Sequence, residues 1–162
     1  MFIVADDCIS IVRLIKWKLE AAFGKEIGVV IAADGKEAVA AFEKLVKENR
    51  QSEIDAVLMD YHMPNMSGLD AISLIRTLES ECGVEQPVSI IGFSADVSDE
   101  MNDMFMRGGA NYLIEKPPEP GALEELCQDI INKRKLQVKS EAANDTSSSP
   151  TSNSDAKTAA QS

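Results

Sequence analysis

Five short apolar runs, separated by segments with helical periodicity, constrain this fold more than any other feature of the sequence. The runs are rich in valine and isoleucine and mostly apolar at consecutive positions, which favours strands covered on both faces. They are Phe2–Ala5, Ile27–Ala33, Ile54–Met59, Val88–Phe93 and Tyr112–Ile114. Strands alternating with helices predict right-handed crossovers. We therefore expect an α/β fold: a five-stranded parallel sheet with helices on both faces.

The segments between the runs carry the signals of amphipathic helices. Over Cys8–Phe23, apolar residues recur at four-residue steps, and Gly24 is placed to end the helix. The starting signals predicted for the four later helices are Asp34, Ser67, Ser98 and Pro120. Each helix thus has a predicted start or end that agrees with the apolar runs beside it.

Charge and composition exclude several classes of function. With 27 acidic and 16 basic residues the chain has a net charge of −11, which argues against binding to nucleic acids or to an anionic membrane. Neither a membrane-spanning apolar run nor a secretory signal is visible, and the three cysteines form no CxxC pair. We expect a cytoplasmic protein with reduced thiols, to which the nucleus is also accessible.

Composition also predicts the domain boundary. Residues 138–162 contain one valine, no aromatic residue and mostly Ser, Thr, Ala, Asn and Asp. Such a segment buries too little apolar surface to offset the entropy lost on ordering. We therefore expect a folded domain over 1–137 and a disordered tail over 138–162.

Polar residues follow four of the predicted strands at the ends where the strands finish. They are Asp6 and Asp7, Asp60, Ser94 and Lys116. In parallel α/β sheets, ligands gather at this carboxyl edge. Two carboxylates roughly 4 Å apart repel by about 4 kcal/mol at an effective dielectric of about 20. One lysine and a divalent cation would relieve this repulsion, and oxygen ligands beside a phosphoryl group suit Mg²⁺.

Five motifs occur in an order and at spacings that resemble the receiver domain of two-component response regulators. They are the pair Asp6–Asp7, the segment AADGKEAVAAF, residues 60–68 (DYHMPNMSG), the pair Ser94–Ala95 and the pair Lys116–Pro117. The resemblance covers roughly residues 2–135. It implies a flavodoxin-like, doubly wound sheet with strand order 2-1-3-4-5.

The resemblance implies a role for each residue of the edge. Asp60 would accept a phosphoryl group from a phosphohistidine. The residues implied to hold Mg²⁺ are Asp6, Asp7 and Asp60, together with the backbone carbonyl of His62. Ser94 would be the switch hydroxyl. Lys116 would pair with the phosphoryl group, and a cis bond would join it to Pro117.

The resemblance also implies partners. A histidine kinase or a histidine phosphotransfer protein would donate the phosphoryl group, and an unidentified protein would read the switched surface. We expect a monomer that is not itself an enzyme. One family feature is missing, because the aromatic switch position holds Leu113 and the neighbouring Tyr112 would point to the opposite face.

Other functions remain open at this point. The chain could be the receiver fragment of a hybrid histidine kinase, or a pseudo-receiver that binds without switching. An aspartate-nucleophile phosphohydrolase would need Asp-x-Asp at the strand end, where Asp60 is followed by Tyr61 and His62. A flavodoxin relative would need a phosphate-cradling first loop, and the loop here, ADDCIS, carries two acids.

Overall fold

The computed structural model describes the backbone of residues 1–145 and the side chains of residues 1–137. Within this part of the chain it has one sheet of five parallel strands, in the order β2-β1-β3-β4-β5. The strands are β1 (Phe2–Ala5), β2 (Val29–Ala32), β3 (Ala56–Asp60), β4 (Ser89–Ser94) and β5 (Tyr112–Glu115). The predicted fold class and strand order are confirmed.

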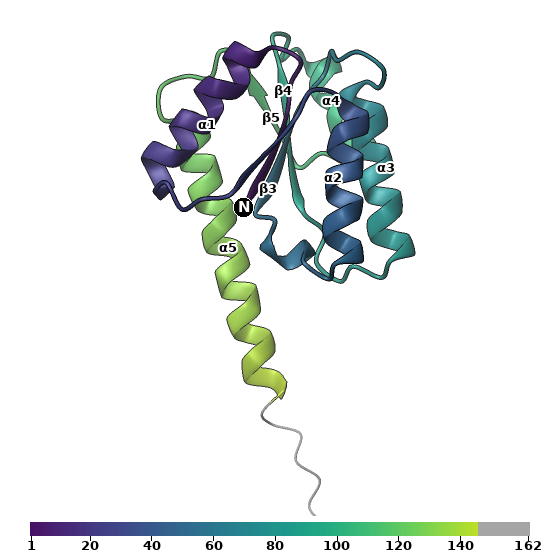
Figure 1. Ribbon diagram of the computed structural model, residues 1–162, viewed down its shortest axis with the longest axis vertical. Helices are drawn as coiled ribbons and strands as arrows, with labels where there is room; N and C mark the ends of the chain where they lie inside the picture. The colour runs from purple at the N-terminus through teal and green to yellow at the C-terminus, as the bar shows by residue number, and fades with distance from the viewer. Residues whose placement is uncertain (146–162) are drawn as a thin grey trace, which may run out of the picture.

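Helices cover both faces of the sheet (Figure 1). They are α1 (Ile9–Phe23), α2 (Gly35–Lys47), α3 (Gly68–Glu81), α4 (Asp99–Gly108) and α5 (Ala122–Asp145), with a short 3₁₀ helix, η1 (Gln51–Glu53), before β3. Helices α1 and α5 lie on one face, and α2, α3 and α4 on the other. Each layer buries its own core, with Ile15, Leu19 and Leu123 on the first side and Phe42, Ile72 and Phe105 on the second.

The predicted helix caps form, with one exception. The side chains of Asp34, Ser67 and Ser98 each accept a hydrogen bond from a backbone N–H three residues on. Pro120 was expected to open the last helix, but α5 begins at Ala122. Gly121 has a φ of +87°, a conformation that cannot continue into a right-handed helix, so Pro120 belongs to the preceding turn.

The predicted domain boundary at residue 137 falls inside α5. The helix continues to Asp145, eight residues further, and extends beyond the body of the domain (Figure 1). Residues 146–162 lie outside the described part, so the disordered tail remains a prediction.

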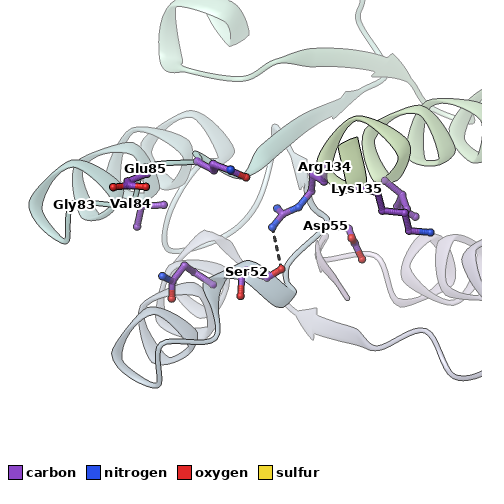
Figure 2. A pocket seen from close by; sticks show the side chains of 10 residues that line it. Ser52, Asp55, Gly83, Val84, Glu85, Arg134 and Lys135 are labelled. Atoms are coloured by element: carbon purple, nitrogen blue, oxygen red, sulfur yellow. Dashed lines mark hydrogen bonds between the residues drawn. The ribbon is translucent and has the colours of Figure 1, made fainter. Parts of the chain in front are cut away.

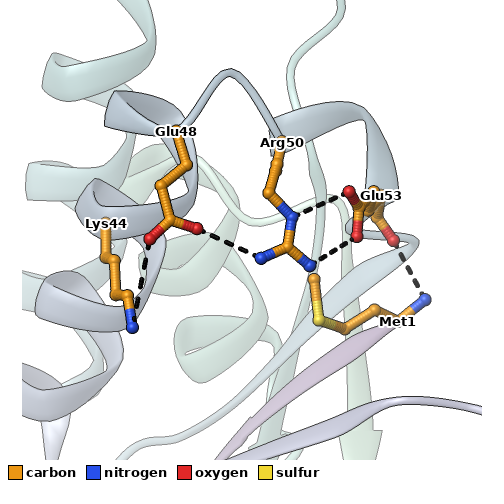
Figure 3. Close-up of polar contacts among 5 residues, drawn as sticks. All are labelled: Met1, Lys44, Glu48, Arg50 and Glu53. Atoms are coloured by element: carbon orange, nitrogen blue, oxygen red, sulfur yellow. Dashed lines mark hydrogen bonds and ion pairs between the residues drawn. The ribbon is translucent and has the colours of Figure 1, made fainter.

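A polar network closes the amino end of the sheet, away from the carboxyl edge (Figure 3). Arg50 donates through Nε and Nη2 to the two carboxylate oxygens of Glu53, both at 2.8 Å, and through Nη1 to Glu48 at 3.1 Å. The ammonium group of Met1 donates to the backbone oxygen of Glu53 at 2.9 Å. Since these side chains are largely exposed, we expect the network to order η1 rather than to stabilise the fold strongly.

In the described residues no helix combines the length and apolar character needed to cross a membrane.

Candidate functional site

The parallel sheet brings the polar residues of four strand ends together at its carboxyl edge. Asp6 and Asp7 follow β1, and Asp60 is the last residue of β3, the neighbouring strand. One carboxylate oxygen from each of these three residues lies within 4.8 Å of those from the other two. Asp6 and Asp60 are buried, whereas Asp7 is exposed. The edge therefore concentrates three negative charges, two of them held away from water.

Lys116 is the cation that partly neutralises this cluster. Its Nζ lies 2.8 Å from Asp60 Oδ1 and also ion-pairs with Asp6 Oδ2. The stem passes Phe93, with Nζ 5.2 Å from the ring centroid. The peptide bond from Lys116 to Pro117 is cis, as the family resemblance implies. With Lys116 in place, the cluster of three carboxylates keeps a net charge of −2.

Burial dominates the electrostatics of Asp60. Loss of water raises the pKa of this carboxyl above its usual value, and the negative charge of Asp6 raises it further. The hydrogen bond and positive charge of Lys116 act in the opposite direction without cancelling the effect. An added cation would favour the ionised form of Asp60, which is the nucleophilic form.

The donor set fits Mg²⁺. In an octahedral site with bonds of 2.0–2.1 Å, ligand oxygens lie about 3 Å apart when adjacent and about 4 Å apart when opposite. The three carboxylates are within a small adjustment of this spacing. Their residual charge also matches a divalent cation. Asp6, Asp7 and Asp60 could therefore hold Mg²⁺.

The loop between β3 and α3 is pressed against the acidic cluster. A Cβ on Gly68 would lie 1.9 Å from the backbone oxygen of Asp60, so only glycine fits there. The N–H of Gly68 donates to the oxygen of Tyr61 at 3.1 Å and closes the loop. A hollow of about 380 Å³ opens beside the cluster. It is lined by Asp7, Tyr61, His62, Met63, Pro64 and Ser67.

The other predicted site residues take distinct positions. Ser94 ends β4 and is buried, and its Oγ accepts a hydrogen bond from the N–H of Asp96 at 3.1 Å. The His62 ring packs edge-on against Tyr61, with centroids 4.3 Å apart. The structure thus places Ser94 at the same sheet edge as Asp60, with its hydroxyl engaged by the following loop.

An aromatic contact beside Asp60 is not evident from the sequence. Tyr61 lies 5.9 Å from the ring of Phe105 in α4, and Phe105 fills the space above Gly92, where a Cβ would lie 2.4 Å from the ring. Tyr112 packs on the face of α1 and α5, and Leu113 on the opposite face, as their alternation predicts. The apolar positions of α4 indicate that Phe105 is buried, but they do not show that it contacts Tyr61.

A larger cavity, of about 710 Å³, lies at the opposite, amino end of the strands (Figure 2). Its walls come from η1, the α3–β4 loop and α5. Arg134 of α5 donates to the backbone oxygen of Ser52 at 3.0 Å across one wall. Because its lining includes Asp55 and Glu85, which precede β3 and β4, this cavity is separate from the acidic cluster.

Comparison with protein-family models shows which family this chain belongs to. The model of the response regulator receiver domain matches residues 2–140. The chain belongs to this family. Hybrid signal transduction histidine kinase I of Dictyostelium discoideum is 30% identical over 131 residues, which cover 81% of the chain and 7% of the kinase. The other most similar curated relatives are likewise matched over only 3–13% of their length.

Solved receiver structures share this fold. The chemotaxis response regulator CheY4 of Vibrio cholerae is 27% identical, with a TM-score of 0.63, over 80% of this chain and 96% of that one. The receiver domain of Ssk1, crystallised with the phosphotransfer protein Ypd1 of Saccharomyces cerevisiae, has a TM-score of 0.67 and is 23% identical, over 84% of this chain and 89% of that one. The receiver domain of the Arabidopsis thaliana kinase CKI1, in complex with Mg²⁺ and BeF₃⁻, has a TM-score of 0.66 and is 24% identical, over 83% of this chain and 89% of that one.

Proposed function

We propose that this receiver domain is a phosphoacceptor in which Asp60 takes a phosphoryl group from a phosphohistidine of a partner protein. One observation carries the proposal: a buried carboxylate at a strand end shares one lysine with a second carboxylate, inside a cluster of three acids. A structural ion pair would need only one acid. The excess negative charge is suited to a site that receives a cation and a phosphoryl group together.

In the proposed reaction, an Asp60 oxygen attacks phosphorus, and an O–P bond forms as the P–N bond of the phosphohistidine breaks. The electron pair of the P–N bond stays on the imidazole nitrogen, which takes a proton. The Lys116 ammonium, 2.8 Å from Asp60, can pair with the phosphoryl oxygens once they carry the negative charge. Ser94 can donate to the same oxygens if its hydroxyl leaves the Asp96 amide.

Mg²⁺ would be held by Asp6, Asp7 and Asp60 with the backbone carbonyl of His62, and when bound it would neutralise charge on the transferring group. The chain's own residues supply the rest of the site. Asp6 is oriented by the N–H of Cys8, which donates to its Oδ1 at 2.9 Å. The hollow over Asp7 and His62 leaves access for a donor imidazole.

The first helix offers a docking surface for the donor protein. Ile9 follows Asp7 by two residues and is exposed, as are Leu14 and Trp17 further along α1. Trp17, the only tryptophan of the chain, is 64% exposed. Large exposed aromatic side chains are typical anchors of protein interfaces. We assign this face to the phosphotransfer partner, since it begins beside the acceptor site.

Labelling with a small phosphodonor tests the proposal. The protein is incubated with acetyl phosphate and Mg²⁺, and its intact mass is followed. We expect a gain of one phosphoryl group in the parent, none in Asp60→Asn, and none when the metal is chelated. Asp70→Asn is the matched control, because Asp70 is a nearby exposed carboxylate bound by Ser67. Equal labelling of Asp60→Asn and the parent would contradict the proposal.

A further inference from the structure

A fourth carboxylate lies at the same edge of the sheet but outside the acidic cluster. Asp34 follows β2 and is only 7% exposed, yet it is not among the acids whose oxygens converge within 4.8 Å. Both of its oxygens are engaged. Oδ1 accepts from the backbone N–H of Glu37 at 2.8 Å, and Oδ2 accepts from the side-chain amide of Asn65 at 2.6 Å. The first bond caps α2, and the second crosses to the β3–α3 loop.

The loop residue that Asp34 holds is conformationally unusual. Asn65 has a φ of +62°, in the left-handed region. Beside it, the loop backbone rests directly on the start of α2: a Cβ on Gly35 would lie 2.8 Å from the oxygen of Met66 and 3.0 Å from that of Ser67. The tip of the loop is therefore pressed against α2 and tied to it by the Asn65 side chain.

We propose that Asp34 is a positioning residue for phosphoacceptance: its second oxygen clamps Asn65 and so holds the β3–α3 loop, which carries His62, in place beside the acidic cluster. The inference rests on the proposed function, because His62 is assigned there to the metal site. The loop is fixed at its far end by Gly68 against Asp60. The hydrogen bond from Asn65 to Asp34, which we call the clamp, fixes the tip of the loop, between Asp60 at its start and Gly68 at its end.

The charge of Asp34 favours this role. The hydrogen bond from Asn65, more than any other contact, lowers the pKa of Asp34 below its ordinary value. The carboxylate is therefore ionised near neutral pH, and a bond to an ionised acceptor is stronger than one between neutral groups.

Two variants separate the clamp from the helix cap. Asp34→Ser keeps an oxygen that can cap α2, since serine is as good an N-cap as aspartate, but removes the second acceptor. Asn65→Gly keeps the positive φ without strain and removes the amide. Glu37→Ala is the matched control. The Glu37 carboxylate accepts from the N–H of Ala33 at 2.8 Å, so its loss weakens the same helix start and leaves the clamp intact.

Two measurements read the loop without relying on activity. In metal-free protein, we expect faster hydrogen exchange at the backbone amides of residues 61–68 in Asp34→Ser and Asn65→Gly, and not in Glu37→Ala. By calorimetric titration, both clamp variants should bind Mg²⁺ about tenfold more weakly, the lower end of the roughly 10- to 100-fold loss found when groups that orient metal ligands are removed. The double variant should be no weaker than either single one, because both changes break one bond.

The outcomes also distinguish this inference from the proposed function. If the parent is labelled on Asp60 but the clamp variants bind Mg²⁺ and exchange amides like the parent, the inference is overturned and the proposed function stands. The same holds if Glu37→Ala loses as much affinity as Asp34→Ser, since the effect then belongs to the cap. If the parent itself neither binds Mg²⁺ nor is labelled, both fall together.

Discussion

Removing the charge of Lys116 is the sharpest test of how the acidic cluster is balanced. At 2.8 Å, the attraction between Nζ and Asp60 is about 6 kcal/mol before desolvation, at an effective dielectric of about 20. Each pair of carboxylates within 4.8 Å repels by at least about 3.5 kcal/mol on the same scale. Lys116 therefore offsets a repulsion comparable to its own attraction, and its loss leaves the acids unbalanced.

We expect Lys116→Gln to lower the free energy of unfolding by about 3 kcal/mol in EDTA, at the low end for breaking a buried pair because the Lys116 side chain is itself 15% exposed to water. Mg²⁺ should restore more stability to this variant than it adds to the parent. Adding Asp60→Asn to Lys116→Gln should also recover part of the loss, because it removes one of the repelling charges.

The assay is urea unfolding followed by circular dichroism, with and without Mg²⁺. Midpoints are compared between variants whose denaturant slopes are equal, so that they report stability. Lys133→Gln serves as the control, since the Lys133 ammonium lies at the surface against the half-buried ring and the hydroxyl of Tyr112, away from the acidic cluster. A Lys116→Gln variant as stable as the parent in EDTA and unresponsive to Mg²⁺ would refute the charge balance.

Three further results follow from the same structure. Because burial raises the pKa of Asp60, its ionised form destabilises the metal-free fold, so Asp60→Asn should melt above the parent near pH 7 and lose this advantage as pH falls through the raised pKa; an advantage that does not change with pH would contradict this. Burial also raises the pKa of Cys127 to about 12, so iodoacetamide at pH 8 should modify the exposed Cys8 and Cys82 in the native protein and all three thiols only after unfolding, as counted by mass. Trp17→Ala should slow transfer from a phosphotransfer protein about tenfold or more and leave labelling by acetyl phosphate unchanged, whereas equal slowing of both would place Trp17 in the chemistry rather than in docking.

Most of the secondary structure could be predicted from local patterns in the sequence. Consecutive apolar positions in the strands and cap residues such as Asp34 and Ser98 depend on neighbours within a few residues, and the five strands and these caps agree with prediction. The strand order, which the family resemblance implied, is also confirmed. The start of α5 was predicted wrongly, because proline is suited both to the first turn of a helix and to a tight turn, and Pro120 lies in the turn. The positive φ of Gly121, which decides between them, is not visible in the sequence.

The candidate site was predictable where it depends on topology. Parallel strands necessarily bring Asp6 and Asp60 to one edge, so their proximity follows from the strand assignment. The second hydrogen bond of Asp34 did not follow, since it joins residues 31 positions apart through a loop conformation set by tertiary packing. The exposure of Trp17 was partly readable, because it lies off the apolar stripe of its helix.

Direct identification of the modified residue tests whether Asp60 is the phosphoacceptor. After labelling with acetyl phosphate and Mg²⁺, reduction with borohydride converts an aspartyl phosphate to homoserine, and trypsin releases residues 51–76 as one peptide between Arg50 and Arg76. Fragment ions separate Asp60 from Asp55 and Asp70 within it. We expect homoserine at position 60 alone. Homoserine at another aspartate, or an unreduced peptide from fully labelled protein, would contradict it.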